Sequence, residues 1–554
     1  MDRRTIWAIL LMMVIAILPA LFLKKPAVPA GRRPDSVTAG APPVAPPPGE
    51  VRADSAATPV VEPAPDGLSP GAAGDTIRVT SPLYTYGIST TGARLVEASL
   101  HHYRSMAQET RGEIAQIIPP GGDFLALTLV LERDTIPLRD WVFTTSAESL
   151  AVSGPTPVRL SATRGNVGVD LTYTFRPDDY RVEIAGQVQG VGPNGGLLLV
   201  GLGPTLANTE ANRDENQQAL ALVTKRDEAE RTNFTGIEPG ETKMVSGPLE
   251  WAAIKSKYFV TAVLAFDSAG GGIAGATVKA APPAADGLRG GAVQLSLPIR
   301  SSGGFGYSLY AGPMEYDRLS RVGHDFYDVN PYGWPGFRTI IRPVAVGVRW
   351  LLVWMHQNLH LAYGLVLVIF GILVRILLWP LNQKAMRANM QLQVVQPLMK
   401  ELQDRYRNDP QRMQQEMFKL YKEYKVNPLG GCWPMLLPMP VLFALFFVFQ
   451  NTIELRGASF LWLPDLSRPD PLYIIPIIMG ASMWWLSKVG MMGMEPNPQM
   501  KMMLYVMPVM MTVLFVNFAS GLNLYYAVSN IASLPQQWLI ARERLRRVGK
   551  PPGG

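Results

Sequence analysis

One arginine lies in the middle of an otherwise apolar run. Arg375 follows Gly371-Ile372-Leu373-Val374, and no acidic residue occurs within twenty positions on either side. An arginine at the centre of a membrane helix costs about 3 kcal/mol on insertion scales, so it needs a partner, water or a route to the lipid headgroups. Three interpretations are open: the side chain reaches the headgroups, it lies in a hydrated cavity, or it forms a fixed ion pair. A fixed pair is the weakest, because acids are scarce in the other apolar runs.

Uncharged polar residues in the later apolar runs are the candidates for the wall of such a cavity, and they concentrate in the last run. In lipid such side chains often simply hydrogen-bond neighbouring helices, and that structural role stays open for each of them. A single cation facing a neutral polar wall could attract a passing carboxylate without holding it permanently. The candidates are Gln450, Asn451, Asn517, Ser520, Asn523, Tyr525, Tyr526, Ser529, Asn530, Gln536 and Gln537.

Other chemistry is poorly supported. The chain has one cysteine and five histidines, which excludes a disulfide scaffold and leaves little room for a metal centre. No nucleotide-binding loop or nucleophile elbow occurs. We therefore expect no catalytic residue, no metal and no cofactor. A sugar-active enzyme would need His101 and His102 with Glu97 or Glu113, and a surface turn is the simpler interpretation of these residues.

Composition indicates a mixed membrane protein. Of the 554 residues, 48% are hydrophobic and 17% are charged, below the roughly 25% charge of soluble domains. The net charge of +7 is uneven, because residues 51–330 are acidic and the remainder is basic. This pattern does not predict a nucleic-acid binder.

The amino-terminal 330 residues divide into three segments. The apolar run Ile6–Leu23 predicts a transmembrane anchor within 1–25, although a cleavable signal is an alternative. Residues 26–75 are rich in proline and alanine and predict an extended linker. Residues 76–330 show period-two alternation, for example at Phe124 to Leu131, and predict a large β-sandwich.

Residues 336–360 switch to helical periodicity. At 100° per residue, one narrow arc collects Arg338, Arg342, Arg349, His356 and His360, while the apolar side chains avoid that arc. We expect this amphipathic helix to lie in the membrane interface rather than to cross it. An ordinary surface helix packed on the β domain is the alternative.

Five further apolar runs complete six predicted spans. They fall at about 361–381, 433–450, 472–489, 502–518 and 522–540. The segment 382–428 and the basic tail 542–554 carry most of the lysine and arginine of the connecting segments, so both are expected in the cytoplasm. The amino terminus is then also cytoplasmic, and residues 76–330 lie outside.

The segment 382–428 predicts a helical hairpin with one apolar stripe on each arm. Asp409 and Pro410 are suited to cap and start the second arm, and Pro397 predicts a kink in the first. The stripe residues expected to receive a substrate are Met390, Leu398, Tyr406, Met413 and Met417.

Several motifs resemble the YidC/Oxa/Albino family of membrane protein insertases. They are Leu373-Val374-Arg375 before Trp379-Pro380-Leu381, Lys425 to Cys432, Ile475 to Gly480, Met507-Pro508, and Ser520 to Asn530. Ile88 to Ala93 and Trp251 to Phe259 more weakly resemble the periplasmic β-super-sandwich of the Gram-negative branch, a fold also found in sugar mutarotases.

The resemblance implies an insertase and chaperone of the bacterial inner membrane that uses no nucleotide. Arg375 would face a hydrophilic groove open to the cytoplasm and the lipid, with Tyr526 as the functional aromatic of the last span. Implied partners are nascent membrane proteins with short acidic translocated tails, the SecYEG/SecDF translocon, the ribosome through the basic residues 542–550, and anionic lipids. One departure is Gly371, where some relatives have a hydroxyl residue one turn before the arginine. A transporter with Arg375 as an anion site is the main competing hypothesis, although we see neither inverted repeats nor midplane charge pairs.

Overall fold

A computed structural model describes most of the chain after its first 73 residues. The described residues are 74–548 except 123, 133, 146–148, 239, 267–271, 282–286, 335, 408, 425–438 and 493–497. The predicted anchor, nearly all of the linker and the motif Lys425 to Cys432 lie outside the described residues. The chain divides into Met1–Gly74 and Asp75–Gly554, and the fold below is that of the second unit.

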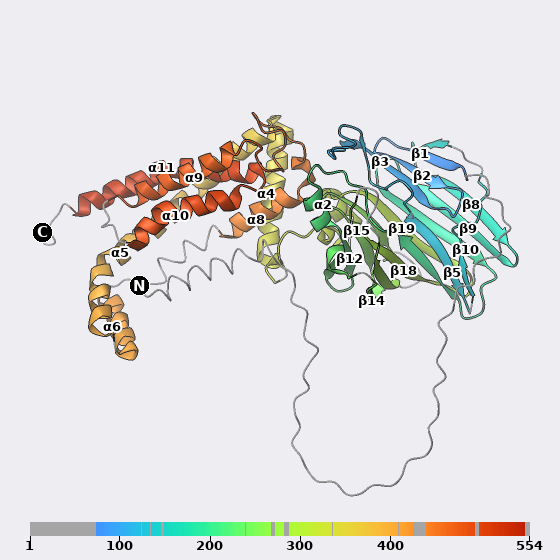
Figure 1. Ribbon diagram of the computed structural model, residues 1–554, viewed down its shortest axis with the longest axis horizontal. Helices are drawn as coiled ribbons and strands as arrows, with labels where there is room; N and C mark the ends of the chain where they lie inside the picture. The colour runs from blue at the N-terminus through green and yellow to red at the C-terminus, as the bar shows by residue number, and fades with distance from the viewer. Residues whose placement is uncertain are drawn as a thin grey trace, which may run out of the picture. The chain divides into compact units, whose positions relative to one another are not determined.

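Two β-sheets build the amino-terminal half of this unit (Figure 1). The 11-stranded sheet has the order β14-β17-β18-β11-β5-β3-β2-β1-β7, with β4 beside β3 and β6 beside β5. Its strands are β1 (Thr76–Thr80), β2 (Tyr84–Ser89), β3 (Leu95–Arg104), β4 (Ile114–Gln116), β5 (Phe124–Leu131), β6 (Asp134–Pro137), β7 (Ser149–Ala151), β11 (Gly196–Leu202), β14 (Thr242–Leu249), β17 (Ile273–Ala280) and β18 (Gly291–Ile299).

The 8-stranded sheet has the order β13-β12-β15-β16-β19-β10-β9-β8 and is antiparallel throughout the pairs described. Its strands are β8 (Thr156–Arg164), β9 (Val167–Phe175), β10 (Arg181–Gln189), β12 (Ala221–Lys225), β13 (Ala229–Asn233), β15 (Trp251–Lys255), β16 (Phe259–Leu264) and β19 (Gly304–Pro313).

One hydrophobic core joins residues of both sheets. Strand β5 alternates buried and half-buried side chains over most of its length, as the period-two pattern predicts for a strand with one face on a core. Strands β15 and β16 are instead buried at every position, so both of their faces are covered. The predicted β-rich domain is therefore present, and its strands agree with the alternating runs of the sequence.

Lys255, the last residue of β15, is an unusual member of this domain. Its side chain is 3% exposed and donates a 2.8 Å hydrogen bond to the Asn330 Oδ1 atom. Burial, reinforced by the charge of Arg231, lowers the pKa of Lys255 well below its usual value of 10.5. An amine whose pKa is lower in the native than in the unfolded chain makes the stability of the domain depend on pH.

Lys255→Met is expected to stabilise the β domain at neutral pH and to flatten its pH profile. Between the lowered native pKa and the usual value, the unfolded chain binds the proton that the native chain lacks. The unfolding free energy of the native sequence therefore rises with pH in this window, by up to about 1.4 kcal/mol per pH unit. Urea midpoints of the full-length protein, followed by near-ultraviolet circular dichroism, measure the slope. Lys279→Met on β17, where the lysine is exposed, is the control, and an unchanged slope in Lys255→Met would contradict the assignment.

Helices form the carboxyl-terminal half. The longer ones are α4 (Arg338–Leu359), α5 (Tyr363–Arg405), α6 (Pro410–Glu423), α8 (Met439–Asn451), α9 (Ile474–Gly490), α10 (Pro498–Phe515) and α11 (Ser520–Val548). Short helices are α2 (Arg213–Ala219), α3 (Tyr316–Val322), η1 (Phe234–Gly236), η2 (Phe326–Val329) and η3 (Ile453–Leu455).

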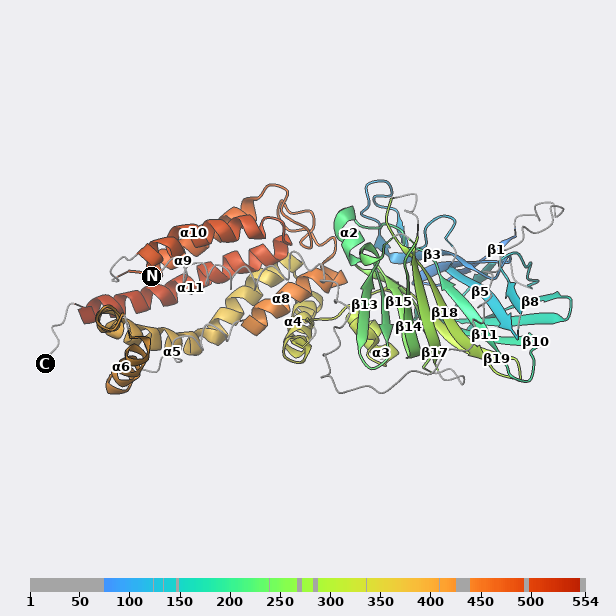
Figure 2. The same cartoon turned by 60° about the horizontal axis from the view of Figure 1, so that its bottom comes forward.

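The last helix organises the others. α11 packs on α9 and on α5, α10 packs on α9, and α8 packs on α4, and Figure 2 shows α9, α10 and α11 running side by side. Among the described residues, Tyr363–Pro380 is the one stretch long and apolar enough to pass a test for a membrane span. Shorter apolar helices occur at Pro440–Asn451, Ile474–Gly490 and Met500–Phe515, so the six predicted spans stay a prediction.

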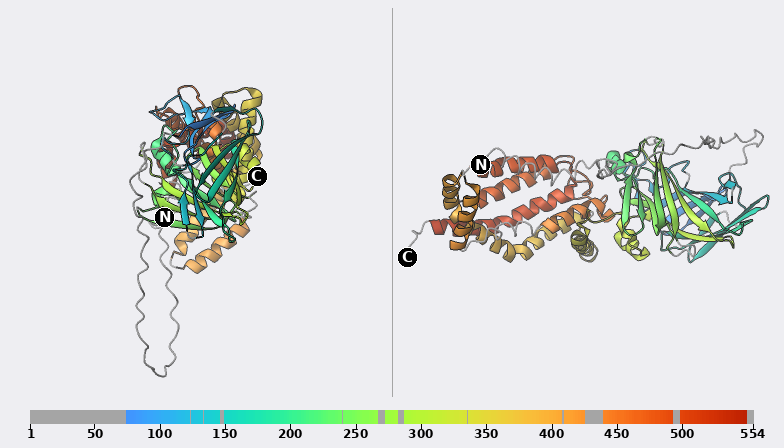
Figure 3. Two further views of the ribbon diagram at one scale, coloured as in Figure 1. Left: turned by 90° about the vertical axis from the view of Figure 1, so that its right-hand side faces the viewer. Right: turned by 90° about the horizontal axis from the view of Figure 1, so that it is seen from below.

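The hairpin begins without a break after the predicted span. α5 is one helix of 43 residues and covers both the predicted run 361–381 and the first arm. Asp409 caps α6 by accepting a 3.1 Å hydrogen bond from the Arg412 backbone N–H, with Pro410 at the first helical position, as the sequence predicts. Figure 3 shows α6 beside the end of α5, and Val395 of α5 and Leu420 of α6 form a small buried cluster there.

Two residues of the cationic stripe of α4, Arg342 and Arg349, are paired with acids rather than exposed to water. The Arg349 guanidinium donates 3.0 and 2.9 Å hydrogen bonds to Asp317 of α3 and also contacts Glu454 of η3, while its side chain is 4% exposed. Arg342 forms a 2.5 Å ion pair with Asp328. The exposed side chains of α4 include Trp350 and Trp354, which stack with centroids 6.4 Å apart. The side of α4 that periodicity marked as polar is thus the side that packs on acidic residues.

A second buried ion pair joins the β domain to the turn after α8. Arg456 Nε lies 3.0 Å from both carboxylate oxygens of Glu210, and the two side chains are 4% and 7% exposed. Its other nitrogens donate to the backbone oxygens of Arg104 at 2.8 Å and Thr209 at 2.9 Å. These four hydrogen bonds saturate much of the guanidinium inside protein.

Candidate functional site

Arg375 lies on α5 against α11. Its Nε donates a 2.9 Å hydrogen bond to the Ser529 Oγ atom of α11, and the residue as a whole is half-buried. Among the described residues no carboxylate forms an ion pair with it. Of the three interpretations open from the sequence, the fixed ion pair therefore receives no support from this part of the chain.

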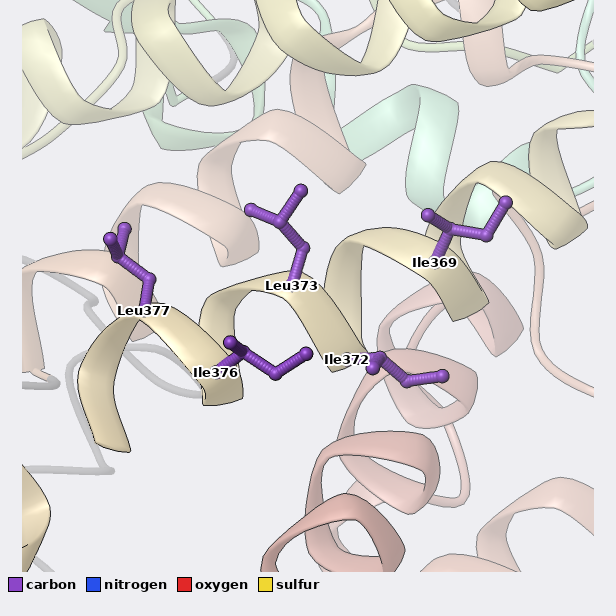
Figure 4. A pocket seen from close by; sticks show the side chains of 5 residues that line it. All are labelled: Ile369, Ile372, Leu373, Ile376 and Leu377. Atoms are coloured by element: carbon purple, nitrogen blue, oxygen red, sulfur yellow. The ribbon is translucent and has the colours of Figure 1, made fainter. Parts of the chain in front are cut away.

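An open apolar cavity lies next to this position. It has a volume of about 400 Å³ and is lined by Ile369, Ile372, Leu373, Ile376 and Leu377 of α5, whose side chains project from one side of the helix in Figure 4. At 100° per residue, Arg375 falls between this exposed apolar surface and the face that packs on α11. The guanidinium thus lies at the border between a polar helix contact and a surface suited to an apolar helix or lipid.

Two further hydrogen bonds connect α11 with its neighbours on either side. The Gln536 side-chain amide donates a 2.8 Å hydrogen bond to the Trp379 backbone oxygen of α5. The Asn530 side-chain amide donates a 3.2 Å hydrogen bond to the Ser482 Oγ atom of α9. Polar side chains that bind neighbouring helices are the ordinary structural use of such residues in lipid. Asn530 therefore has a packing role in addition to any role in a groove.

Asn523 leaves one polar atom unsatisfied. Its amide nitrogen donates a 2.9 Å hydrogen bond to the Phe515 backbone oxygen, and the residue is fully buried. The Asn523 Oδ1 atom accepts no hydrogen bond from the part of the chain that the structure describes. A buried acceptor of this kind calls for a donor such as water or a substrate N–H group.

Two aromatic residues of α11, Tyr525 and Tyr526, lie close to Arg375 of α5. Tyr525 contacts Phe370 of α5 at 5.8 Å between ring centroids, and Tyr526 contacts Phe515 of α10 at 5.4 Å. Gly371 lies where α5 and α11 approach, since a Cβ atom there would come within 3.2 Å of the Val528 Cγ1 atom. Its missing side chain lets the two helices approach closely, which gives the departure from the family pattern a packing reason.

Two predicted groove residues do not join this cluster. Gln450 is exposed at the end of α8, and Asn517 is exposed in the turn before α11. Asn517 instead lines a separate open cavity of about 380 Å³ together with Arg213, Arg468 and Tyr473. Nothing in the sequence distinguishes these amides from those near Arg375, because all of them flank the same apolar helices.

The predicted hairpin residues lie on both of its arms. Leu398 packs at the small cluster of Val395 and Leu420, and the Tyr406 ring lies 6.0 Å from the Arg412 guanidinium. Met413 and Met417 are half-buried on α6, whereas Phe418 is 62% exposed. Met390 is on α5, but its side chain lies outside the description.

The residues weighed for sugar chemistry do not form the surface turn expected from the sequence, because Glu97, His101 and His102 lie on strand β3. Their contacts are ordinary ones. His101 Nε2 shares a 2.9 Å hydrogen bond with the Thr85 hydroxyl, and Glu97 forms a 3.2 Å ion pair with Arg78. No group of His, Cys, Asp and Glu suited to a metal occurs among the described residues.

Sequence reasoning missed the acidic partners of α4 and of the turn after α8. Asp317 and Glu454 pair with Arg349, and Glu210 pairs with Arg456. The sequence did contain one indication of these ion pairs, namely the charged residues Glu454 and Arg456 in a short segment between apolar runs. Their partners come from distant parts of the chain that no local spacing identifies.

Comparison with known proteins covers both halves of the chain. The family described as "YidC periplasmic domain" matches residues 76–345, and the family described as "60Kd inner membrane protein" matches residues 354–547. Insertases named "Membrane protein insertase YidC" are 30% identical in Oleidesulfovibrio alaskensis, over 88% of this chain and 91% of the relative, and 32% identical in Chlorobium phaeovibrioides, over 83% and 82%. A solved structure titled "Active YidC insertase crystal structure with the first transmembrane domain resolved" is 17% identical over 84% of this chain and 95% of that chain, with a TM-score of 0.34. The chain therefore belongs to the YidC family of inner-membrane protein insertases, which are neither hydrolases nor transferases.

Proposed function

We propose that this insertase moves its substrates through a hydrophilic groove in which Arg375 receives the acidic tail of a nascent membrane protein. The observation that carries the proposal is a guanidinium that is half-buried at the edge of an apolar surface and forms no ion pair with the described residues. In the described part of the chain, its hydrogen-bond partner is the neutral Ser529 hydroxyl. An arginine in this state can accept a passing carboxylate, because no acid among the described residues competes with it.

The energetics of the proposed path need no nucleotide. A short polar tail loses water when it enters the membrane, and a charged donor with nearby polar groups lowers that cost. Burying about 20 apolar residues of the following helix in lipid then provides the driving force. The apolar face of α5 at Ile372 and Ile376 offers a surface along which such a helix can leave.

The arrangement in the membrane is part of the same proposal. Six spans place both termini and the hairpin 382–428 in the cytoplasm, and residues 76–330 in the periplasm. The positive charge of the hairpin and of the tail 542–554 supports this orientation. Substrates first meet the hairpin at Leu398, Tyr406, Met413 and Met417, and the basic tail favours ribosomes and anionic lipids. Cooperation with the SecYEG/SecDF translocon belongs to the proposal by family membership.

Complementation with Arg375 variants tests the groove. In cells depleted of their own insertase, Arg375→Ala is expected to lower insertion of a single-span protein with an acidic translocated tail by about tenfold or more, since a hydrogen bond to a charged group is worth about 1.5–3 kcal/mol. Arg375→Lys should keep part of the activity, because charge is retained while the planar fork is lost. The measurement is protease protection of the translocated tail in pulse-labelled cells.

Two controls make this test specific. The same substrate with its tail acids changed to amides should be inserted equally well by the native protein and by Arg375→Ala. Arg300→Ala, at an exposed turn of the β domain, should behave as the native protein. Full insertion of the acidic-tail substrate by Arg375→Ala would refute the role of this cation.

A further inference from the structure

The hydroxyl that contacts Arg375 belongs to a residue that is otherwise shielded from solvent. Ser529 is 1% exposed on α11, and its Oγ atom lies 2.9 Å from Arg375 Nε. Nε is the inner donor of the guanidinium, next to the aliphatic stem. A hydrogen bond at Nε therefore fixes the plane of the group and directs both terminal nitrogens to its far edge.

We infer that Ser529 is a positioning residue for insertion, which holds the Arg375 guanidinium so that its two terminal nitrogens are presented together to a substrate carboxylate. This inference rests on the proposed role of Arg375 and adds the residue that orients it. The partner it implies is a carboxylate bound by two parallel hydrogen bonds. An arginine side chain without a fixed orientation would lose conformational entropy on adopting this geometry.

A neutral partner suits this purpose better than an acid. A carboxylate at position 529 would neutralise Arg375 and compete with the substrate. A hydroxyl accepts one N–H group, leaves the positive charge uncompensated and thus keeps the site attractive to a passing anion. The position of Ser529 is also constrained, because α11 packs on both α5 and α9.

The chain provides a matched control one helical turn away. Ser533 is 6% exposed on the same helix, and its Oγ atom donates a 2.7 Å hydrogen bond to the Ser529 backbone oxygen. It has the same side chain, the same helix and nearly the same burial as Ser529, but it bonds to backbone instead of Arg375. A loss common to both alanine variants would therefore reflect helix packing and not orientation of the guanidinium.

The test compares Ser529→Ala, Ser529→Thr and Ser533→Ala in the full-length protein. We use two single-span substrates that differ only in an acidic or an amidated translocated tail. Ser529→Ala is expected to lower insertion of the acidic-tail substrate roughly three- to tenfold and to leave the amidated-tail substrate unchanged. Ser529→Thr should insert the acidic-tail substrate as well as the native protein does, because it keeps the hydroxyl. Ser533→Ala should insert both substrates as well as the native protein does. Immunoblots of the membrane fraction confirm equal amounts of each variant.

A double variant tests whether Ser529 acts through Arg375 or independently of it. Since Ser529 acts through Arg375, Arg375→Ala with Ser529→Ala should be no worse than Arg375→Ala alone. The inference is overturned if Ser529→Ala inserts the acidic-tail substrate normally, if it impairs both substrates equally, or if the two changes multiply. If Arg375→Ala itself has no effect on the acidic-tail substrate, the groove proposal fails with it. If only Ser529→Ala is without effect, the groove proposal stands and the positioning role is wrong.

Discussion

Arg456→Met is expected to release the turn after α8 from the β domain. Arg456 and Glu210 are 4% and 7% exposed, and the guanidinium also binds the backbone oxygens of Arg104 and Thr209. Removing Arg456 leaves the buried Glu210 carboxylate with one hydrogen-bond donor among the described residues, the Thr209 hydroxyl at 3.0 Å. Breaking a buried pair in this way costs about 3–5 kcal/mol.

Hydrogen exchange of the full-length protein in nanodiscs measures this loss. Faster exchange is expected in residues 453–463 and around Met106, whose backbone N–H binds the Thr209 oxygen at 2.8 Å. The double change Glu210→Gln with Arg456→Met should recover part of the protection, because no uncompensated charge is then buried. Arg176→Met is the control, since Arg176 and Glu183 form a surface pair that is 43% and 55% exposed and worth less than about 1 kcal/mol. Equal protection in Arg456→Met and in the native protein would show that the pair does not hold the two parts together.

Arg349→Met is expected to destabilise the packing of α4, by less than Arg456→Met destabilises its turn, because the acids that pair with Arg349 are more exposed. The arginine is 4% exposed and lies between Asp317 and Glu454, which are 66% and 21% exposed. Its loss leaves two like charges near each other with no cation between them. Because solvent screens the exposed Asp317, the expected cost is about 1.5–3 kcal/mol. Hydrogen exchange along α4 and proteolysis near Leu359 report the change.

Removing the charge of either acid should destabilise α4, and the two variants should differ in the size of the effect. Glu454→Gln should cost more than Asp317→Asn, because the less exposed carboxylate interacts with Arg349 in a medium of lower dielectric. Arg349→Lys should fall between the native protein and Arg349→Met, since lysine keeps the charge but cannot bind two acids with a planar fork. If Asp317→Asn lowers the protection of α4 more than Glu454→Gln does, this order is wrong.

The sequence is informative where structure depends on local periodicity. Alternation predicts strands such as Phe124–Leu131, and the pair Asp409-Pro410 predicts the start of α6. Both follow from interactions within a few residues, namely side-chain alternation on a half-buried strand and the capping of free N–H groups.

Contacts between distant elements could not be predicted in the same way. The polar arc of α4 predicts a helix that lies in the membrane interface, and nothing in that arc identifies the acids that pair with Arg349, which are 32 and 105 residues away. Arg375 binds Ser529 at a separation of 154 residues, and Ser529 was one of eleven similar polar candidates. Periodicity locates a face of a helix, whereas only tertiary packing decides what covers that face.

The unbroken course of α5 has a mechanical consequence. A helix rises about 1.5 Å per residue, so roughly 45 Å of helix separates Arg375 from the hairpin end of α5 at Arg405. Under the proposed role of the hairpin, a protein bound there and the guanidinium of Arg375 share one helix, so a tilt of α5 at the hairpin would also turn the cation. Pro380 and Pro397 lie between the two, and the motion passed along α5 depends on how far these prolines let the helix bend.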